Sequence, residues 1–322
     1  MYFIFQVHGR LFLTLRSPFK IPNQNKGFFM RFPEYFQNSE KPVISFELFP
    51  PKTDVGMRTI RQRLLPNLAK HNPSYMTVTY GAMGSTQSKT LEIASLIKNE
   101  FGFESACHLT CVGSSRADIN DILSKIRDAG ISNIVALRGD PPQGSDTFVV
   151  PQDGFAHADG LIKHIRTTEP NDAPFGLAVA GYPEKHIEAS DLNADIQNLK
   201  VKIDAGGDII ITQLFYDNKA YFDFVDKVRA VGIQAPVIAG LMPILSAKQI
   251  QRITSMCGAT IPPDLAAKLN TAIDDDDKAE KIGIDQCIAQ ATELLEKGAP
   301  GIHFYVLNKH THMAEIMSAL PL

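Results

Sequence analysis

The chain has 322 residues, of which 44% are hydrophobic and 21% are charged, a composition typical of a globular protein with a substantial core. Its formal net charge of −3 provides no basic excess for a phosphate backbone, which disfavours nucleic-acid binding. Four cysteines in a chain of this length do not indicate a disulfide framework, and Cys107 and Cys111 lack a zinc-binding spacing. We therefore expect reduced thiols, no metal site and a cytoplasmic location.

The first thirty residues differ from the rest of the chain. They contain no acidic residue, and His8, Arg10 and Arg16 interrupt their apolar pieces. No apolar run approaches the ~20 residues that a membrane span needs, and the pattern of a secretory signal is missing. A transit peptide fits this composition, but an upstream extension before Met30 is the simpler interpretation. We expect residues 1–30 to be disordered or not native, and residues 31–322 to form one domain.

Short apolar segments of β-type alternate with helical patterns along the rest of the chain. Most are continuously apolar, as strands covered on both faces should be, and most follow at roughly thirty-residue intervals, the length of a βα unit. The predicted strands are Val43–Pro50, Tyr75–Gly81, Ser105–Gly113, Asn133–Asp140, Phe175–Pro183, Asp208–Asp217, Pro236–Ile244 and Gly301–Asn308.

The segments between these strands have helical periodicity. In residues 114–130 the apolar positions recur at i, i+3, i+4 and i+7, with Ser114 or Ser115 as the N-cap and Gly130 after the last turn. The connection 245–300 is about twice the usual length and is expected to hold extra helices. Repeated βα units predict a (β/α)8 TIM barrel. A doubly wound sheet is the alternative, but no Gly-x-Gly-x-x-Gly follows an early strand.

Polar side chains stand near the carboxyl ends of nearly all the predicted strands, where TIM-barrel active sites lie. A single one of them, such as His108, has about even odds of being an ordinary core residue, but the pattern across strands predicts a site. These residues are Glu47, Thr79, Tyr80, His108, Arg138, Asp140, Tyr182, Gln213, Tyr305 and Asn308.

Two carboxylates among them suggest chemistry. Glu47 lies between Phe46 and Leu48, so we expect apolar surroundings to raise its pKa, as suits a general acid at neutral pH. The alternative is an ion pair with a lysine or arginine of the barrel. Asp140, in "LRGDPP", is by itself equally consistent with an ordinary turn aspartate.

A helical row after the fifth strand is a further candidate site. Asp195, Asn198 and Lys202 fall at i, i+3 and i+7 and therefore share one face. A solvated surface stripe is the default explanation. The same row suits a nucleotide, with the lysine on a phosphate and the aspartate on hydroxyls.

Several motifs together carry a family resemblance. "SFELFPPK", "TVTYGA", "HLTC", "ALRGDPP", "AGYPEKH", "KVKIDAGGDIIITQLFYD", "GLMPI" and "HFYVLN" occur in this order between Pro42 and the C-terminus. This part of the chain resembles the methylenetetrahydrofolate reductases, and its length resembles the short bacterial form without a regulatory domain.

The resemblance implies a flavoprotein of one-carbon metabolism. Non-covalent FAD would take a hydride at N5 from NADH or NADPH and pass it to 5,10-methylenetetrahydrofolate in ping-pong order. The length of the chain, which resembles the bacterial form, is the only feature that favours NADH over NADPH. The product, 5-methyltetrahydrofolate, would supply methyl groups for methionine synthesis. The resemblance also implies a homo-oligomer.

The motif match assigns roles residue by residue. Glu47 would protonate N10 of the folate, and Asp140 would lie beside the flavin and the pterin. The residues implied for FAD are Thr79, Tyr80, Ala82, His108, Arg138, Gly139, Asp140, His157, Ala158, Tyr182, His186, Asp195, Asn198 and Lys202. Those implied for the substrates are Glu47, Thr79, Asp140, Gln213, Gln249 and Lys309.

Two positions depart from the family pattern. Ile253 stands where some members have a stacking aromatic residue, and Gly207 replaces a common alanine, which predicts a looser turn behind Asp195 and Lys202. Two other functions remain as alternatives. One is a different flavin barrel, such as a proline dehydrogenase-like oxidase, which does not need Glu47. The other is a folate-binding or partner-dependent subunit whose flavin NADH does not reduce.

Overall fold

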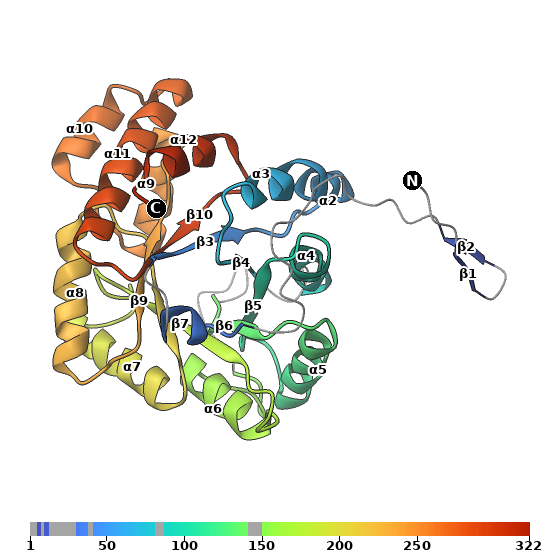
Figure 1. Cartoon of the computed structure of the whole chain (residues 1–322). Coiled ribbons are helices and arrows are strands. Elements are labelled where there is room, and N and C mark those ends of the chain that lie inside the picture. Colours follow the sequence, from blue (N-terminus) through green and yellow to red (C-terminus); the bar gives the residue numbers. More distant parts are fainter. Residues whose placement is uncertain (1–4, 8–9, 13–29, 38–40, 81–86, 141–149) are drawn as a thin grey trace.

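The structure, a computed structural model, describes residues 5–7, 10–12, 30–37, 41–80, 87–140 and 150–322 (Figure 1). Its central element is a closed barrel of parallel strands ringed by helices, which confirms the predicted (β/α)8 TIM barrel. The strands pair in the order β10-β3-β4-β5-β6-β7-β8-β9. Their bounds are β3 Val43–Leu48, β4 Tyr75–Val78, β5 Glu104–Thr110, β6 Asn133–Leu137, β7 Gly176–Gly181, β8 Ile209–Thr212, β9 Val237–Leu241 and β10 Gly301–Tyr305.

Helices follow the strands and cover the outside of the barrel. None within the described ranges is long and apolar enough to cross a membrane. Their bounds are α1 Glu34–Gln37, α2 Asp54–Thr59, the π-helical turn η1 Ile60–Leu64, α3 Leu65–Ala69, α4 Gln87–Asn99, α5 Arg116–Asp128, α6 Ala158–Thr168, α7 Leu192–Asp204, α8 Asn218–Ala230, α9 Ala247–Cys257, α10 Pro263–Asn270, α11 Asp276–Glu296 and α12 Thr311–Ala319.

The strand period of two separates the residues of each strand into two environments. Ile44, Phe46 and Leu48 of β3 belong to the large core between barrel and helices. Val43 belongs instead to a smaller apolar cluster with residues of β4 to β9, at the amino-terminal end of the barrel interior. Ser45 and Glu47 have the same parity as Val43, so the interior becomes polar toward the carboxyl ends.

The amino-terminal end of the barrel is closed by the segment before β3. Phe32 is fully buried, its N–H donates to Asn133 Oδ1 at 2.7 Å, and its ring contacts Tyr75 edge-on at 4.9 Å. Asn133 Nδ2 donates to the Met30 carbonyl, also from within the barrel end. The folded barrel therefore extends back to Met30. Before it, the short strands β1 Phe5–Val7 and β2 Arg10–Phe12 pair only with each other.

The extended connection before the last strand holds α9, α10 and α11, as predicted. Its acidic run starts a helix: Asp275 is the N-cap of α11 and accepts the Lys278 N–H, and Asp276 and Asp277 fill the first turn. Carboxylates stabilise this end because the helix dipole presents partial positive charge there.

Gly207 lies in the tight turn from α7 into β8. Its N–H donates to the Lys202 carbonyl at 3.1 Å, and a Cβ at this position would lie 2.8 Å from Val179 Cγ1. Glycine therefore lets α7 pack closely on β7, in a space where the family's alanine would need its neighbours to shift.

Candidate active site

Glu47 lies near the carboxyl end of β3, in register with Tyr305 of β10 and Thr77 of β4. Its side chain is buried, yet it faces polar groups. Glu47 Oε2 lies 3.1 Å from Nε2 of His108 on β5 and 3.1 Å from Nε2 of His303 on β10. Thr77 Oγ1 donates to the same oxygen at 3.4 Å. One carboxylate thus sits between two imidazoles inside the barrel.

This arrangement corrects the predicted environment of Glu47. Burial alone raises the pKa of the carboxyl, but the close contacts with His108 and His303 outweigh it and lower the pKa to about 2. The expectation of an apolar pocket that keeps the carboxyl protonated at neutral pH was wrong. The partners are also histidines, whereas the alternative interpretation named lysine or arginine.

The two histidines contact Glu47 differently. His303 Nε2 is aligned for a hydrogen bond with Glu47, and its Nδ1 is 2.8 Å from Ser45 Oγ. His108 Nε2 is close enough for an ion pair but finds no well-aligned hydrogen bond among the described residues. Nearby, Tyr305 Oη donates to the Thr212 carbonyl at 2.7 Å. No group of side chains in the described ranges is arranged to hold a metal ion.

A second cluster forms over β6, β7 and α7. Arg138 makes a two-pronged ion pair with Glu188, at 2.6 and 2.7 Å, and the Glu188 N–H donates to His186 Nδ1. The His186 ring meets the Tyr182 ring edge-on at 4.8 Å, and the His186 N–H donates to Asp195 Oδ2 at 2.9 Å. Predicted residues from separate segments are thus brought together.

Lys202 completes this cluster from α7. Its Nζ lies 5.8 Å from the centre of the Tyr182 ring and donates to the Ala180 carbonyl at 2.6 Å. Burial lowers the pKa of Lys202 to about 8, although the charges of Asp195 and Asp159 oppose this shift. Burying a cation of this kind is unfavourable unless an anion joins it, so the site is prepared for a negatively charged group.

The N-terminus of α6 adds backbone donors for an anion. His157 is its N-cap but makes no side-chain capping hydrogen bond, so the first N–H groups of the helix stay available. Ala158 is buried at the first helical position. Together with Lys202, Arg138 and Asp195, these groups provide cations and backbone donors for phosphates and a carboxylate for hydroxyls, a set that fits a dinucleotide such as FAD.

Other predicted residues lie at the same face but share fewer contacts. Thr79 and Tyr80 are half-buried after β4, Gly139 takes φ +88°, and Asp140 is exposed beside it. The Gln213 side chain accepts the Leu214 N–H at the end of β8. The remaining three, which make no described contact with either cluster, are the exposed residues Asn198, Gln249 and Lys309. Ala82 lies outside the described residues, and Ile253 packs in the apolar cluster of α9 to α11.

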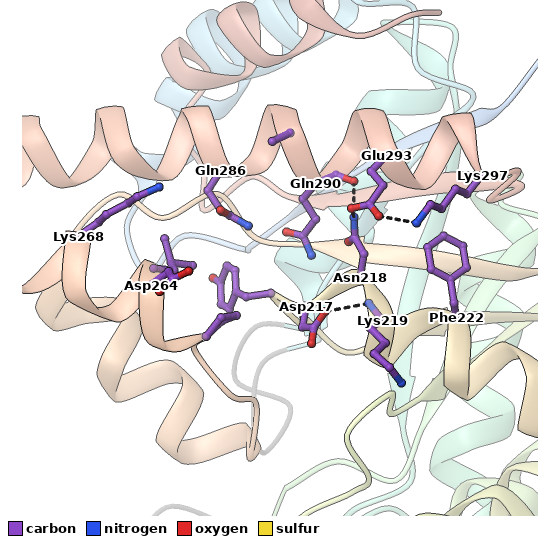
Figure 2. A pocket seen from close by; sticks show the side chains of 14 residues that line it. Asp217, Asn218, Lys219, Phe222, Asp264, Lys268, Gln286, Gln290, Glu293 and Lys297 are labelled. Carbon is purple, nitrogen blue, oxygen red and sulfur yellow. Dashed lines mark hydrogen bonds and ion pairs between the residues drawn. The ribbon is translucent and has the colours of Figure 1, made fainter.

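Two cavities differ in whether predicted site residues line them. One of about 480 Å³ opens between α4 and α5 and is lined by Tyr80 and His108. A cavity of about 690 Å³ lies between α8, α10 and α11 (Figure 2). There Glu293 pairs with Lys297 and accepts a hydrogen bond from Asn218. None of the predicted site residues lines the second cavity, so its size does not make it the candidate site.

The sequence did not predict several residues of the site, among them His303 and Glu188. His303 lies in the middle of β10, whereas the predicted site residues lie near the strand ends. The alternation Gly301, His303, Tyr305 points it to the same side as Tyr305, a signal that was available. Glu188 lies in the loop after β7, where its partner Arg138 is fifty residues away, so no local pattern indicated it.

A parallel barrel with carboxylate, imidazole and cationic clusters at the carboxyl-end face defines a TIM barrel of the kind that binds ligands there. The family model described as methylenetetrahydrofolate reductase matches residues 33–321. The chain belongs to the methylenetetrahydrofolate reductase family.

Relatives of two lengths support this membership. The chain is 41% identical over 275 residues to "Methylenetetrahydrofolate reductase (NADH) 1" of Arabidopsis thaliana, covering 83% of this chain and 46% of that protein. It is 34% identical over 266 residues to the "5,10-methylenetetrahydrofolate reductase" of Salmonella typhimurium, covering 83% of this chain and 86% of that protein. The chain therefore spans about half the length of the plant relative and most of the bacterial one.

A solved structure agrees on the fold. An uncharacterised protein from Clostridium thermocellum superposes with a TM-score of 0.58 at 17% identity, covering 87% of this chain and 94% of that one. At this identity the similarity shows the barrel fold alone.

Proposed function

We propose that this protein reduces 5,10-methylenetetrahydrofolate to 5-methyltetrahydrofolate with NADH or NADPH as hydride donor. The observation that carries the proposal is the Glu47 cluster, because ring opening of the folate needs a proton inside the barrel. Family membership supports the same reaction. The Clostridium thermocellum barrel binds two copies of 5-methyl-5,6,7,8-tetrahydrofolic acid, so the fold is compatible with the product.

FAD is the cofactor that the second cluster fits best. Lys202 and the N-terminus of α6 would hold its phosphates, with Arg138 as a further cation, and Asp195 would bind hydroxyl groups. When bound, the flavin would accept a hydride from the nicotinamide and give it to the folate, the two substrates taking turns. A preference for NADH, a homo-oligomeric state and contacts of Gln213, Gln249 and Lys309 with substrate stay predictions.

Glu47 would deliver the proton that opens the imidazolidine ring of the folate. Protonation at N10 lets the bond from N10 to the methylene carbon break, and the methylene group becomes an iminium on N5 that can accept a hydride. Because the carboxyl is ionised at rest, the proton has to come from its imidazole partners. Asp140, exposed near the end of β6, would hold the pterin.

Glu47→Gln tests this function. The variant keeps the size of the side chain and removes the acid. We expect NADH oxidation by the FAD-loaded protein to persist and the rate of folate reduction to fall by about 10²–10⁴-fold. Each half-reaction is followed separately by flavin absorbance under anaerobic conditions.

Glu296→Gln, an exposed change at the end of α11, is the matched control and should behave like the wild type in both half-reactions. Loss of both half-reactions, or of neither, in Glu47→Gln would contradict the proposal. A wild-type flavin that NADH does not reduce would indicate a partner-dependent subunit.

A further inference from the structure

A buried chain of polar side chains runs through the barrel interior. Ser45 Oγ lies 2.8 Å from His303 Nδ1, His303 Nε2 lies 3.1 Å from Glu47 Oε2, and that oxygen lies 3.1 Å from His108 Nε2. Ser45 and His303 are fully buried. A barrel interior does not need this chain for packing, because apolar residues fill its amino-terminal end.

Ser45 allows His303 to exist in two protonation states. When the ring is neutral with its proton on Nε2, the Ser45 hydroxyl can donate to Nδ1. When the ring is protonated on both nitrogens, Nδ1 donates to Ser45 Oγ, and the hydroxyl can turn to the Ile302 carbonyl, 3.5 Å away. In both of these states Nε2 donates to Glu47, and in the neutral ring that is left when Nε2 gives up its proton, Nδ1–H still donates to Ser45 Oγ. A hydroxyl that serves as donor or acceptor thus leaves neither state with an unpaired nitrogen.

We propose that His303 is a positioning residue that fixes the Glu47 carboxylate and stores the proton that Glu47 passes to the folate, with Ser45 supporting both states of its ring. This inference rests on the proposed function and goes beyond it, since it assigns the proton source to a residue that does not touch the substrate.

The proton balance is simple. His303 gives its Nε2 proton to Glu47, and Glu47 gives that proton to N10 as the bond to the methylene carbon breaks, with the bonding electrons remaining on N10. His303 is then neutral with its remaining proton on Nδ1, which donates to Ser45 Oγ; Glu47 is again a carboxylate, and one proton from solvent returns to Nε2. His108 is the group that can return this proton, because it contacts the same carboxylate oxygen and is 8% exposed.

Few other titratable groups face Glu47 and His303. Tyr75 of β4 lies near Ser45, and Tyr305 of β10 lies edge-on to the His303 ring at 5.4 Å. Burial raises the pKa of both phenols, so neither ionises near neutral pH. On β9 the residue beside His303 is Gly240. Among the described neighbours, His108 and His303 are therefore the groups that can exchange a proton with Glu47.

The test compares two substitutions of the same residue. His303→Gln places an amide near the Nε2 position and keeps a donor for Glu47, whereas His303→Asn reaches only the Nδ1 position beside Ser45. Neither amide can store a proton. We expect both variants to fold and to keep the NADH half-reaction within twofold. The folate half-reaction should slow by about tenfold or more in His303→Gln and further in His303→Asn.

The pH dependence of the folate half-reaction distinguishes a His303 that stores a proton from a His303 that only fills space. In the wild type the folate half-reaction should decline at high pH as the stored proton is lost, and in His303→Gln this decline should move to lower pH while folate KM changes little. His164→Gln, in α6 and in contact with Asn120 of α5, is the control and should leave the profile unchanged. A wild-type rate and profile in His303→Gln would overturn the inference.

A turnover-independent measurement keeps the two proposals apart. In protein labelled with ¹³C at histidine rings, His303→Gln identifies the His303 signal. We expect Glu47→Gln to shift that signal, because it removes the carboxylate that Nε2 faces. An unshifted signal would contradict the proposed coupling even if the enzyme is active. Failure of the wild type to reduce the folate, with the coupling intact, would contradict the function instead.

Discussion

His312 is a buried imidazole whose surroundings are the opposite of those of His303. It is 1% exposed at the start of α12, and neither ring nitrogen has a hydrogen-bond partner among the described residues. Burial, aided by the charges of Lys309 and His310, lowers its pKa to about 4. The folded protein therefore holds this ring in the neutral form, and an unfolded chain binds a proton there first as the pH falls.

Because the unfolded chain binds a proton at His312 more readily than the folded protein does, acid should lower the stability of the fold. Stability contributed by neutral His312 is complete above its unfolded pKa of 6.5 and is lost as the pH falls from there toward 4. Between pH 7 and pH 5 the loss should be about 2 kcal/mol of unfolding free energy. His312→Leu cannot be protonated, so urea unfolding should show a smaller fall for this variant over that interval. Equal falls in both proteins would contradict this account of His312.

The sequence predicted residue identities better than residue environments. Glu47 was found because a carboxylate in an apolar strand is unusual, and the structure places it in the barrel interior. Its pKa was predicted in the wrong direction because His303 is 256 residues away and meets Glu47 only when the last strand closes the barrel on the first. Contacts between residues so far apart in the sequence form only when the barrel closes, and they leave no local sequence pattern.

At the scale of elements, α5 shows how local chemistry fixes a helix start. Ser115 Oγ accepts the Asp118 N–H at 3.2 Å, and Asp118 Oδ2 accepts the Ser115 N–H at 2.9 Å, which together form a capping box. Ser114 contributes only a long contact to the Val112 carbonyl at 3.5 Å. The two serines that the sequence left as alternatives are thereby distinguished.

The two serines provide a matched pair of variants. Ser115→Ala removes the acceptor for a helix N–H and should lower the unfolding free energy by about 1 kcal/mol. Ser114→Ala should change it by less than about 0.5 kcal/mol, the range for ordinary surface substitutions. Denaturant unfolding of both variants measures the difference. A larger effect at Ser114 would show that the helix starts one residue earlier.

The elements themselves were predictable because each has its own periodicity. Apolar runs, most of them continuous, predicted the barrel strands, and the 3.6-residue repeat predicted helices such as α5. The predicted strands ran too long at their carboxyl ends. Residues such as Thr79 and Arg138 leave the sheet before the polar groups begin, and hydrophobicity alone does not show where pairing stops.

At the scale of the whole molecule, the barrel is closed at its amino-terminal end by residues that precede the first strand. The rings of Phe32 and Tyr75 meet edge-on there, Asn133 holds the backbone at Met30 and Phe32, and Tyr35 Oη donates to the Ser74 carbonyl. We propose that the folding unit starts at Met30 and that residues 1–29 are dispensable for its stability.

Two truncations test this boundary. A chain that starts at Met30 should unfold at the same temperature as the full chain, within about 2 °C. A chain that starts at Lys41 loses Phe32 and α1, and should be less stable by about 3–5 kcal/mol, the usual cost of losing a buried phenylalanine. Circular dichroism during heating measures both. A destabilised Met30 chain would show that earlier residues belong to the folding unit.

The anaerobic visible spectrum of the purified, FAD-reconstituted protein tests the central claim most directly. NADH is added first and 5,10-methylenetetrahydrofolate second, in one cuvette. The account predicts an oxidised flavin spectrum that bleaches with NADH and returns with the folate, together with formation of 5-methyltetrahydrofolate. A protein that cannot bind FAD, or a reduced flavin that the folate leaves unchanged, would contradict it.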